Sequence, residues 1–247
     1  MDTYGLIGYP LAQSFSQKYF SSKFDIERID ARYLNFSIPS INEFPGLVSH
    51  HPYIAGMNVT IPYKEQIIPF LDEIDETAKE IGAVNVINFD WINEKPFLKG
   101  YNTDTIGFTR SLLPLLKPMH SKALILGTGG AAKSVAYSLK KLGLIYRFVS
   151  RHPQNTAQIG YNDLTAEVMD SHLLIVNTSP LGMFPNINGC PEIPYDFLTS
   201  DHLLYDLVYN PEVTTFLRKG LEKGAQIKNG LEMLYIQADE AWKIWNS

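Results

Sequence analysis

The chain has 247 residues, of which 45% are hydrophobic, 19% charged and 12% aromatic, and its formal net charge is -5. This composition is typical of a folded globular protein and excludes a disordered or fibrous chain. A mildly acidic chain lacks the positive potential that concentrates proteins on nucleic acid or anionic lipid, so we expect neither as a partner. The single cysteine, Cys190, excludes an internal disulfide framework and a zinc site built on several thiolates, and we expect no metal.

No apolar run reaches the ~18 residues needed to cross a bilayer, and the first residues lack the basic then apolar order of a signal peptide. We therefore expect a cytoplasmic protein. In that compartment the three Asn-x-Ser/Thr triplets that begin at Asn35, Asn58 and Asn177 carry no glycan, so they need another explanation.

Short apolar runs alternate with amphipathic ones over residues 1–101. The alternation predicts a β-α-β-α-β order, which is typical of a parallel sheet with crossover helices. We expect strands at 4–9, 32–36, 53–59, 83–89 and 97–101, and helices at 17–24, 41–48, 65–70, 73–81 and 105–113.

A second alternating series begins at Lys122. It predicts strands at 123–126, 146–150, 173–177 and 203–207, a helix that ends at Leu142, a loop at 180–194 and a last helix from Leu231. The fold class is therefore α/β, with two open α/β domains and a cleft between them that can enclose a small molecule.

A glycine-rich turn, Gly127-Thr128-Gly129-Gly130-Ala131-Ala132, follows the strand at 123–126 and opens the next helix. It matches the G-x-G-x-x-G/A pattern of Rossmann-type dinucleotide sites. In that pattern Gly127 permits the tight turn, Gly129 lets the backbone approach a pyrophosphate, and Ala132 allows close helix packing. The alternative is an ordinary glycine-rich turn without a ligand.

The next strand ends in Ser150-Arg151, where an NAD site normally has a carboxylate for the ribose 2′-hydroxyl. A guanidinium holds a phosphate with two hydrogen bonds, so Arg151 favours NADP over NAD. The alternative is an ordinary exposed arginine in a loop.

Polar side chains gather where strands of the first domain end, at 14–16, 58–64, 82–85 and 102–104. Ligands of open α/β sheets bind at the carboxyl ends of strands, so we expect these groups to converge. Each also has a simpler explanation. Ser14, Ser16 and Asp104 are candidate helix caps, Asn85 and Asn102 can bond local backbone, and Lys64 can lie in solvent.

Together these segments resemble the shikimate dehydrogenase family. The motifs are Gly8-Tyr9-Pro10 with Ser14 and Ser16, followed in the family order by 58–64, 82–85, 100–107, 127–131, 177–183 and 230–237. The resemblance implies a substrate-binding domain at 1–102 plus 232–247, with a mainly parallel sheet, and an NADP-binding Rossmann domain at 103–231. It implies reversible, NADPH-dependent reduction of 3-dehydroshikimate to shikimate, a step toward chorismate and the aromatic amino acids.

The resemblance also implies roles for particular side chains. Lys64 and Asp104 flank the carbon that accepts hydride, with Lys64 acting as the acid, as a stabiliser of the developing alkoxide, or as both. The implied substrate-binding residues are Ser14, Ser16, Thr60, Asn85, Tyr209 and Gln237. The implied cofactor-binding residues are Gly127, Gly129, Gly130, Ala131, Ser150, Arg151, Thr178, Met183, Leu207 and Gly230. The resemblance places Met183 and Met233 around the nicotinamide, and the alternative for each is core packing.

Two features depart from the family pattern and leave open the affinity for NADP and the second wall of the adenine pocket. Ser150-Arg151-His152 stands where many NADP-dependent members have Asn-Arg-Thr, and the region 150–170 is short. One rival is a quinate or dual quinate/shikimate dehydrogenase that uses NAD. Another is a non-catalytic dinucleotide-binding regulator, although the presence of both Lys64 and Asp104 argues against it. We expect a monomer or a homodimer, with a hinge between the domains.

Overall fold

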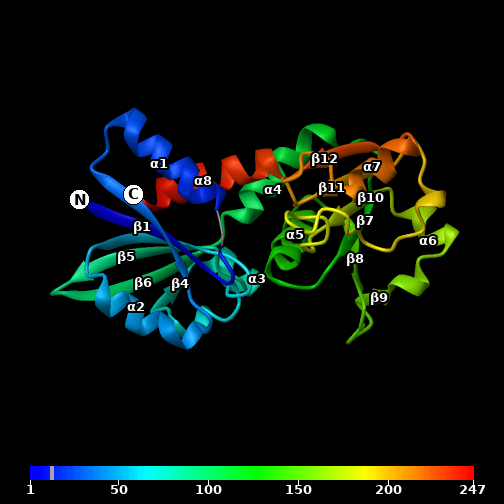
Figure 1. Cartoon of the computed structure of the whole chain (residues 1–247). Coiled ribbons are helices and arrows are strands. Elements are labelled where there is room, and N and C mark those ends of the chain that lie inside the picture. Colours follow the sequence, from blue (N-terminus) through cyan, green and yellow to red (C-terminus); the bar gives the residue numbers. More distant parts are fainter. Residues whose placement is uncertain (12–13) are drawn as a thin grey trace. The chain divides into compact units, whose positions relative to one another are not determined.

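The computed structural model describes residues 1–11 and 14–247. Contacts between Cα atoms divide the chain into two compact units. Unit 1 comprises Met1–Thr103 together with Ala238–Ser247, and unit 2 comprises Asp104–Gln237. Each unit has its own six-stranded sheet flanked by helices, which confirms the predicted α/β class (Figure 1).

The sheet of unit 1 has the order β2-β1-β3-β5-β6-β4. β1 is parallel to β2 and β3, and β4 is parallel to β6, whereas β5 runs antiparallel to both β3 and β6. The sheet is therefore mixed: the pairs of β1 and the β4–β6 pair are parallel, and β5 is antiparallel to both of its neighbours. The strands are β1 (Asp2–Gly8), β2 (Ala31–Ser37), β3 (Ile54–Val59), β4 (Glu73–Ile74), β5 (Val86–Ile92) and β6 (Lys95–Tyr101).

The helices of unit 1 are α1 (Phe15–Glu27), α2 (Phe44–His50) and α3 (Glu76–Ile81), with short 3-10 helices at Ile41–Glu43 and Ile68–Phe70. The helix predicted over 73–81 is wrong in its first part, because Glu73–Ile74 pair with β6. Asp75 then starts α3, since its carboxylate accepts the amide hydrogens of Thr77 and Ala78. The helix predicted over 65–70 is also wrong: turns occupy this stretch, and only its end is helical.

Successive residues of β1 point to opposite faces of the sheet, and each face has its own core. Leu6 packs with Phe20 of α1 and with Trp245 near the end of α8 (Leu231–Trp245). Ile7 belongs to the other cluster, with Phe44 and other side chains of α2. The last residues of the chain are therefore part of the core of unit 1.

All strand pairs of unit 2 are parallel, in the order β12-β11-β10-β7-β8-β9. Counted along the chain from β7, this is the 3-2-1-4-5-6 order of Rossmann folds, which bind ligands where the order reverses, between β7 and β10. The strands are β7 (Lys122–Leu126), β8 (Ile145–Ser150), β9 (Gln158–Gly160), β10 (Leu174–Asn177), β11 (Leu203–Asp206) and β12 (Gln226–Asn229).

The helices that begin in unit 2 are α4 (Asp104–Leu112), α5 (Gly130–Lys141), α6 (Ala166–Ser171), α7 (Thr215–Glu222) and α8, with short 3-10 helices at Leu113–Leu115, Tyr161–Asp163 and Tyr195–Phe197. The sequence patterns did not assign β9, α6, α7 or β12. In the described part of the chain, no helix combines the length and the apolar character that a membrane span requires.

Candidate active site

Five of the predicted cofactor residues lie along one edge of the unit 2 sheet. Gly230, Leu207, Thr178 and Gly127 follow β12, β11, β10 and β7, which are neighbours in that order, and Ser150 ends β8. Because all these strands are parallel, their carboxyl ends meet at the same edge. The sheet thus brings together side chains and amides from five separate parts of the sequence.

The glycine-rich turn is shaped as the dinucleotide pattern requires. Gly127 has φ +121°, a conformation that L side chains rarely adopt, and a Cβ there would lie 2.6 Å from Oγ1 of Thr178. Thr178 is fixed in turn, because its amide and its hydroxyl both donate to the carbonyl oxygen of Leu126, at 3.0 and 2.8 Å. The two predicted residues Gly127 and Thr178 are therefore in contact.

The start of α5 offers an open approach to its backbone amides. Gly129 is the N-cap and makes no side-chain cap hydrogen bond, and a Cβ added there would meet nothing within 4 Å. The first amides of a helix lack partners inside the helix and carry partial positive charge, so they suit a phosphate. Ala132, by contrast, is buried in the core, as its predicted packing role requires.

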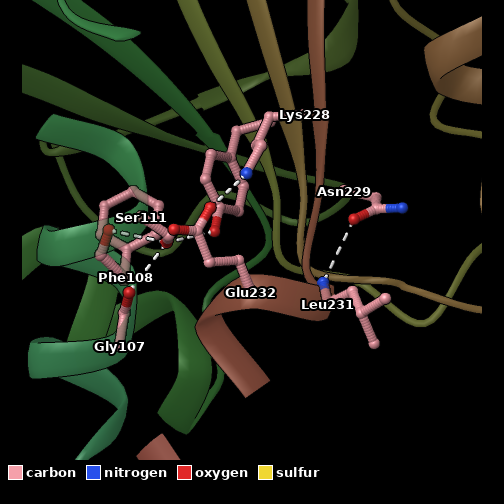
Figure 2. Close-up of polar contacts among 8 residues, drawn as sticks. Gly107, Phe108, Ser111, Lys228, Asn229, Leu231 and Glu232 are labelled. Atoms are coloured by element: carbon pink, nitrogen blue, oxygen red, sulfur yellow. Dashed lines mark hydrogen bonds and ion pairs between the residues drawn. The ribbon is translucent and has the colours of Figure 1, made fainter. Parts of the chain in front are cut away.

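The start of α8 packs directly on the strand end that carries Leu207. A Cβ at Gly230 would overlap the carbonyl oxygen of Leu207, so only glycine fits there without backbone movement. The Asn229 side chain accepts the amide hydrogen of Leu231 at 3.2 Å and so fixes the first turn of α8, where Glu232 also pairs with Lys228 (Figure 2).

Asp104 and Gln237 lie on two helices that pack closely within unit 2. Gly107 is one turn after Asp104 on α4, and a Cβ there would lie 2.6 Å from the carbonyl oxygen of Met233 and 3.2 Å from Cβ of Gln237. Asp104 and Gln237 are both buried. Ser111, one turn further along α4, bonds the backbone of Gly107 (Figure 2). Its hydroxyl also bonds the hydroxyl of Tyr205 on β11, which anchors α4 to the sheet.

Arg151 is exposed, and its positive charge interacts electrostatically with Tyr161. Burial raises the pKa of Tyr161, and the Arg151 guanidinium opposes that rise. The hydroxyl of Ser150 accepts the amide hydrogen of His152, which is itself exposed. Of the two methionines, Met233 is buried in the core, whereas Met183 is 44% exposed and so is not core filling.

In unit 1, backbone hydrogen bonds bring Thr60, Lys64 and Asn85 to one end of the sheet. The Thr60 amide donates to the carbonyl of Ile7 at the end of β1, and the carbonyl of Lys64 accepts from Val84 at 2.7 Å. The carbonyl of Asn85 accepts from Val59, the last residue of β3. Thr60 and Lys64 follow the carboxyl end of β3, as predicted, whereas Asn85 directly precedes β5 and reaches the same end of the sheet because β5 runs antiparallel to β3. Lys64 is half-buried, so it does not lie free in solvent.

The two serines occupy the first turn of α1. Ser14 is the N-cap, as its simpler explanation predicted, and its hydroxyl oxygen accepts the amide hydrogen of Gln17 at 3.1 Å. Ser16 is buried. Burial raises the pKa of Tyr33 and a hydrogen bond with Ser16 opposes that rise, while the Tyr33 hydroxyl donates to Oδ1 of Asn58 at 2.6 Å.

Asn85 and Thr103 are joined by reciprocal hydrogen bonds. The Thr103 amide donates to Oδ1 of Asn85 at 2.7 Å, and Nδ2 of Asn85 donates to Oγ1 of Thr103 at 3.1 Å. Asn102 donates to the carbonyl of Ala83, which is the local backbone contact that its alternative explanation predicted. Thr103 directly precedes Asp104, so these bonds fix the chain where α4 begins.

Comparison with known proteins identifies the family. A family profile described as the shikimate dehydrogenase substrate binding domain matches residues 6–87. The shikimate dehydrogenase (NADP(+)) of Desulforamulus reducens is 36% identical over 98% of this chain and 88% of its own length. This chain belongs to the shikimate dehydrogenase family.

Solved structures of shikimate dehydrogenases agree with this assignment. That of the Aquifex aeolicus enzyme has a TM-score of 0.86 at 36% identity and covers 100% of this chain and 92% of that one. That of the Thermus thermophilus enzyme, in complex with NADP(H) and shikimate, has a TM-score of 0.85 at 29% identity, with 99% and 93% of the two chains covered.

Sequence reasoning missed a buried hydrogen-bond network that links the family motif at 177–183 to the end of β11. Asp206, which is fully buried, accepts from Asn177, from the amide of Val208 and from Thr214, at 2.9, 3.0 and 2.6 Å. Oδ1 of Asn177 accepts the amide hydrogen of Ser179. The network thus fixes the segments after β10 and β11, which carry Thr178, Leu207 and Tyr209.

Burial raises the pKa of Asp206 to about 6, although its three hydrogen bonds act in the opposite direction. The sequence signal was present, because Asp206 directly follows the apolar run of β11. The triplets at Asn35, Asn58 and Asn177 are now explained as well. Each asparagine side chain joins a hydrogen-bond network at a strand of one of the two sheets.

Proposed function

We propose that this chain is an NADP-dependent shikimate dehydrogenase, which reversibly reduces 3-dehydroshikimate to shikimate. In this proposal, unit 1 binds the substrate and unit 2 binds the cofactor. The observation that carries the proposal is the edge of the unit 2 sheet. Along that edge this chain, which aligns with a shikimate dehydrogenase over 98% of its length, has a glycine turn that sterics require and a helix start without a side-chain cap. An exposed arginine follows the neighbouring strand, where the 2′-phosphate of NADP is expected to bind.

The chemistry sets what the side chains must do. Bound NADPH supplies a hydride to the substrate carbonyl carbon, and negative charge then develops on the carbonyl oxygen. Lys64 stabilises that charge as an ammonium donor or gives up its proton to it, and Asp104 holds the lysine and the substrate hydroxyl in position. In the reverse direction Lys64, as the free amine, would take up the hydroxyl proton while Asp104 holds both groups in position, and bound NADP+ would accept the hydride.

The substrate carries a carboxylate and ring hydroxyls. Ser14 and Ser16 hold the carboxylate, and Thr60, Asn85, Tyr209 and Gln237 bind the hydroxyls or the carboxylate. Short hydroxyl and amide side chains suit this task, because they donate and accept at fixed positions without adding charge.

On the cofactor side, Gly127, Gly129, Gly130 and Ala131 present backbone amides to the diphosphate. Thr178, Met183, Leu207 and Gly230 surround the nicotinamide, and Ser150 and Arg151 hold the 2′-phosphate. A guanidinium matches a phosphate in charge and in hydrogen-bond geometry, which is why NADP is expected to bind better than NAD.

The test is a set of four assays that follow reduced-nicotinamide absorbance with shikimate or quinate, each paired with NADP or NAD. We expect the fastest turnover with shikimate and NADP. A preference for quinate and NAD would favour the rival dehydrogenase, and no turnover in any pairing would favour a non-catalytic regulator.

A substitution separates cofactor choice from general damage. Arg151→Ala should raise the KM for NADP about tenfold or more, the scale of a charge-assisted phosphate contact, and change that for NAD little. Arg147→Ala is the matched control, because Arg147 is an exposed arginine on β8, the strand that Arg151 directly follows. Equal effects of Arg151→Ala on both cofactors would remove Arg151 from 2′-phosphate binding.

A further inference from the structure

A relay of hydrogen bonds connects the backbone of β2 to the hydroxyl of Ser14. Nε2 of Gln17 donates to the carbonyl oxygen of Tyr33 at 3.3 Å, and Nδ2 of Asn35 donates to Oε1 of Gln17 at 2.9 Å. Oγ of Ser14 donates to Oδ1 of Asn35 at 2.7 Å. All four residues belong to α1, its cap and β2, so the relay lies wholly within unit 1.

The direction of every bond in the relay is fixed by its first member. A backbone carbonyl can only accept, so Gln17 must turn its NH2 group toward Tyr33 and its Oε1 toward Asn35. Asn35 must then donate to Gln17 and present its own oxygen to Ser14. Reversing either amide would place two acceptors or two donors against each other. The hydroxyl hydrogen of Ser14 therefore points at Asn35.

The helix cap does not depend on that hydrogen. Oγ of Ser14 accepts the amide hydrogen of Gln17 with a lone pair. Rotation about the Cβ–Oγ bond moves the hydroxyl hydrogen to a new acceptor and leaves the oxygen in place. Ser14 can thus exchange one acceptor for another while α1 keeps its start.

We infer that Asn35 positions the Ser14 hydroxyl hydrogen and competes with the substrate carboxylate for it: Asn35 accepts this hydrogen before substrate binds, and the carboxylate accepts it afterwards. The inference rests on the proposed function, in which Ser14 binds that group. An ionised carboxylate is a stronger acceptor than an amide oxygen, so it wins the hydrogen. Asn35 is half-buried, so water can satisfy its freed oxygen. Asn35 therefore weakens substrate binding, because each binding event breaks one hydrogen bond.

The test removes the competing acceptor and keeps the size of the side chain. Asn35→Leu should lower the KM and the dissociation constant for shikimate about 2- to 10-fold, the equilibrium equivalent of one ordinary hydrogen bond. The kcat and the KM for NADP should not change, because the bond is broken on binding and not in the chemical step. Asn88→Leu is the matched control, since Asn88 is a half-buried asparagine on β5 of the same sheet that bonds Asp90.

The opposite substitution provides a second arm. Asn35→Asp keeps an acceptor for Ser14 and adds a negative charge beside the carboxylate, so the KM for shikimate should rise about tenfold or more. If Asn35→Leu does not fold, Asn35→Ala is measured in its place. A fall in KM with Asn35→Asp would contradict the inference.

A double-mutant cycle with Ser14→Ala shows whether Asn35 acts through Ser14. In the Ser14→Ala background, Asn35→Leu should leave the KM for shikimate unchanged, because no hydroxyl remains to compete for. A rise in KM with Asn35→Leu, or an equal change in both backgrounds, would overturn the inference. Either of these KM results leaves the proposed function standing if the unsubstituted protein oxidises shikimate. Absence of turnover with every pairing of substrate and cofactor would overturn both the proposed function and the role of Asn35.

Discussion

The buried carboxylate of Asp206 should make the free energy of unfolding depend on pH by an amount that can be calculated. Its pKa rises from an ordinary value of 3.8 to about 6 on folding, because burial disfavours the charged form. Each tenfold change in proton affinity corresponds to ~1.4 kcal/mol, so ionising Asp206 in the folded protein costs ~3 kcal/mol more than in the unfolded chain. The folded state binds the proton more tightly. The free energy of unfolding therefore loses ~3 kcal/mol through this group as the pH rises from well below 4 to above 6.

The measurement compares the protein with Asp206→Asn, which has nearly the same shape and no charge to titrate. Urea unfolding followed by circular dichroism from pH 4 to pH 7 gives the free energy of unfolding of both. The difference, protein minus variant, should fall by ~2.4 kcal/mol over this range, since other titrating groups cancel and a small part of the loss occurs below pH 4. Asp196 is exposed, and Lys223 lowers its pKa. The difference in unfolding free energy between the protein and Asp196→Asn should therefore change little over this range, and with the opposite sign. Parallel pH curves for the protein and Asp206→Asn would refute the reasoning.

Three further predictions address catalysis, the cofactor edge and acid sensitivity. Lys64→Ala should lower kcat by ~10²-fold or more, the usual scale for loss of a positioned acid or charge stabiliser, and an unchanged kcat would remove Lys64 from the mechanism. Gly230→Ala should destabilise the protein by about 1–3 kcal/mol and raise the KM for NADP, because the new methyl group meets the Leu207 backbone; an unchanged melting temperature would contradict this. Burial lowers the pKa of His172 and His202, so their stabilising contribution is complete above pH 6.5 and is lost as the pH falls below it. Replacing both by Gln should flatten the fall in unfolding free energy between pH 6.5 and 5, and an equally steep fall would count against the argument.

Much of unit 2 can be predicted from the sequence because its signals are local. The apolar run of β7 followed by the glycine turn predicts both a strand and the start of α5, and the structure confirms both. β12 escaped prediction because Gln226–Asn229 is half-buried at the edge of the sheet and has no apolar run. α7 escaped because Gly220 interrupts its pattern, yet this glycine is needed where the helix packs on Leu204.

The candidate site shows the same limit. Its residues could be chosen from motifs, but the direction of the hydrogen bond from Ser14 could not. That direction is set by Tyr33 and Asn35, which reach α1 only when β2 pairs with β1. The buried state of Asp206 likewise depends on Thr214, eight residues further along the chain. Contacts of this kind form only in the folded chain, so they cannot be predicted from residue types and their spacing alone.

The return of the chain to unit 1 has a consequence for synthesis on the ribosome. Trp245 lies against Gly56 and donates its indole hydrogen to the carbonyl of Ile87 at 3.0 Å, while Ala238 and Ala241 complete the same core. At ~5–20 residues per second, translation reaches these residues on the order of ten seconds after Thr103 has been added. During that interval the nascent amino-terminal unit exposes the apolar surface around Phe20 that Trp245 later covers. The part made first is thus the part finished last, and a nascent-chain binding factor would find its target there.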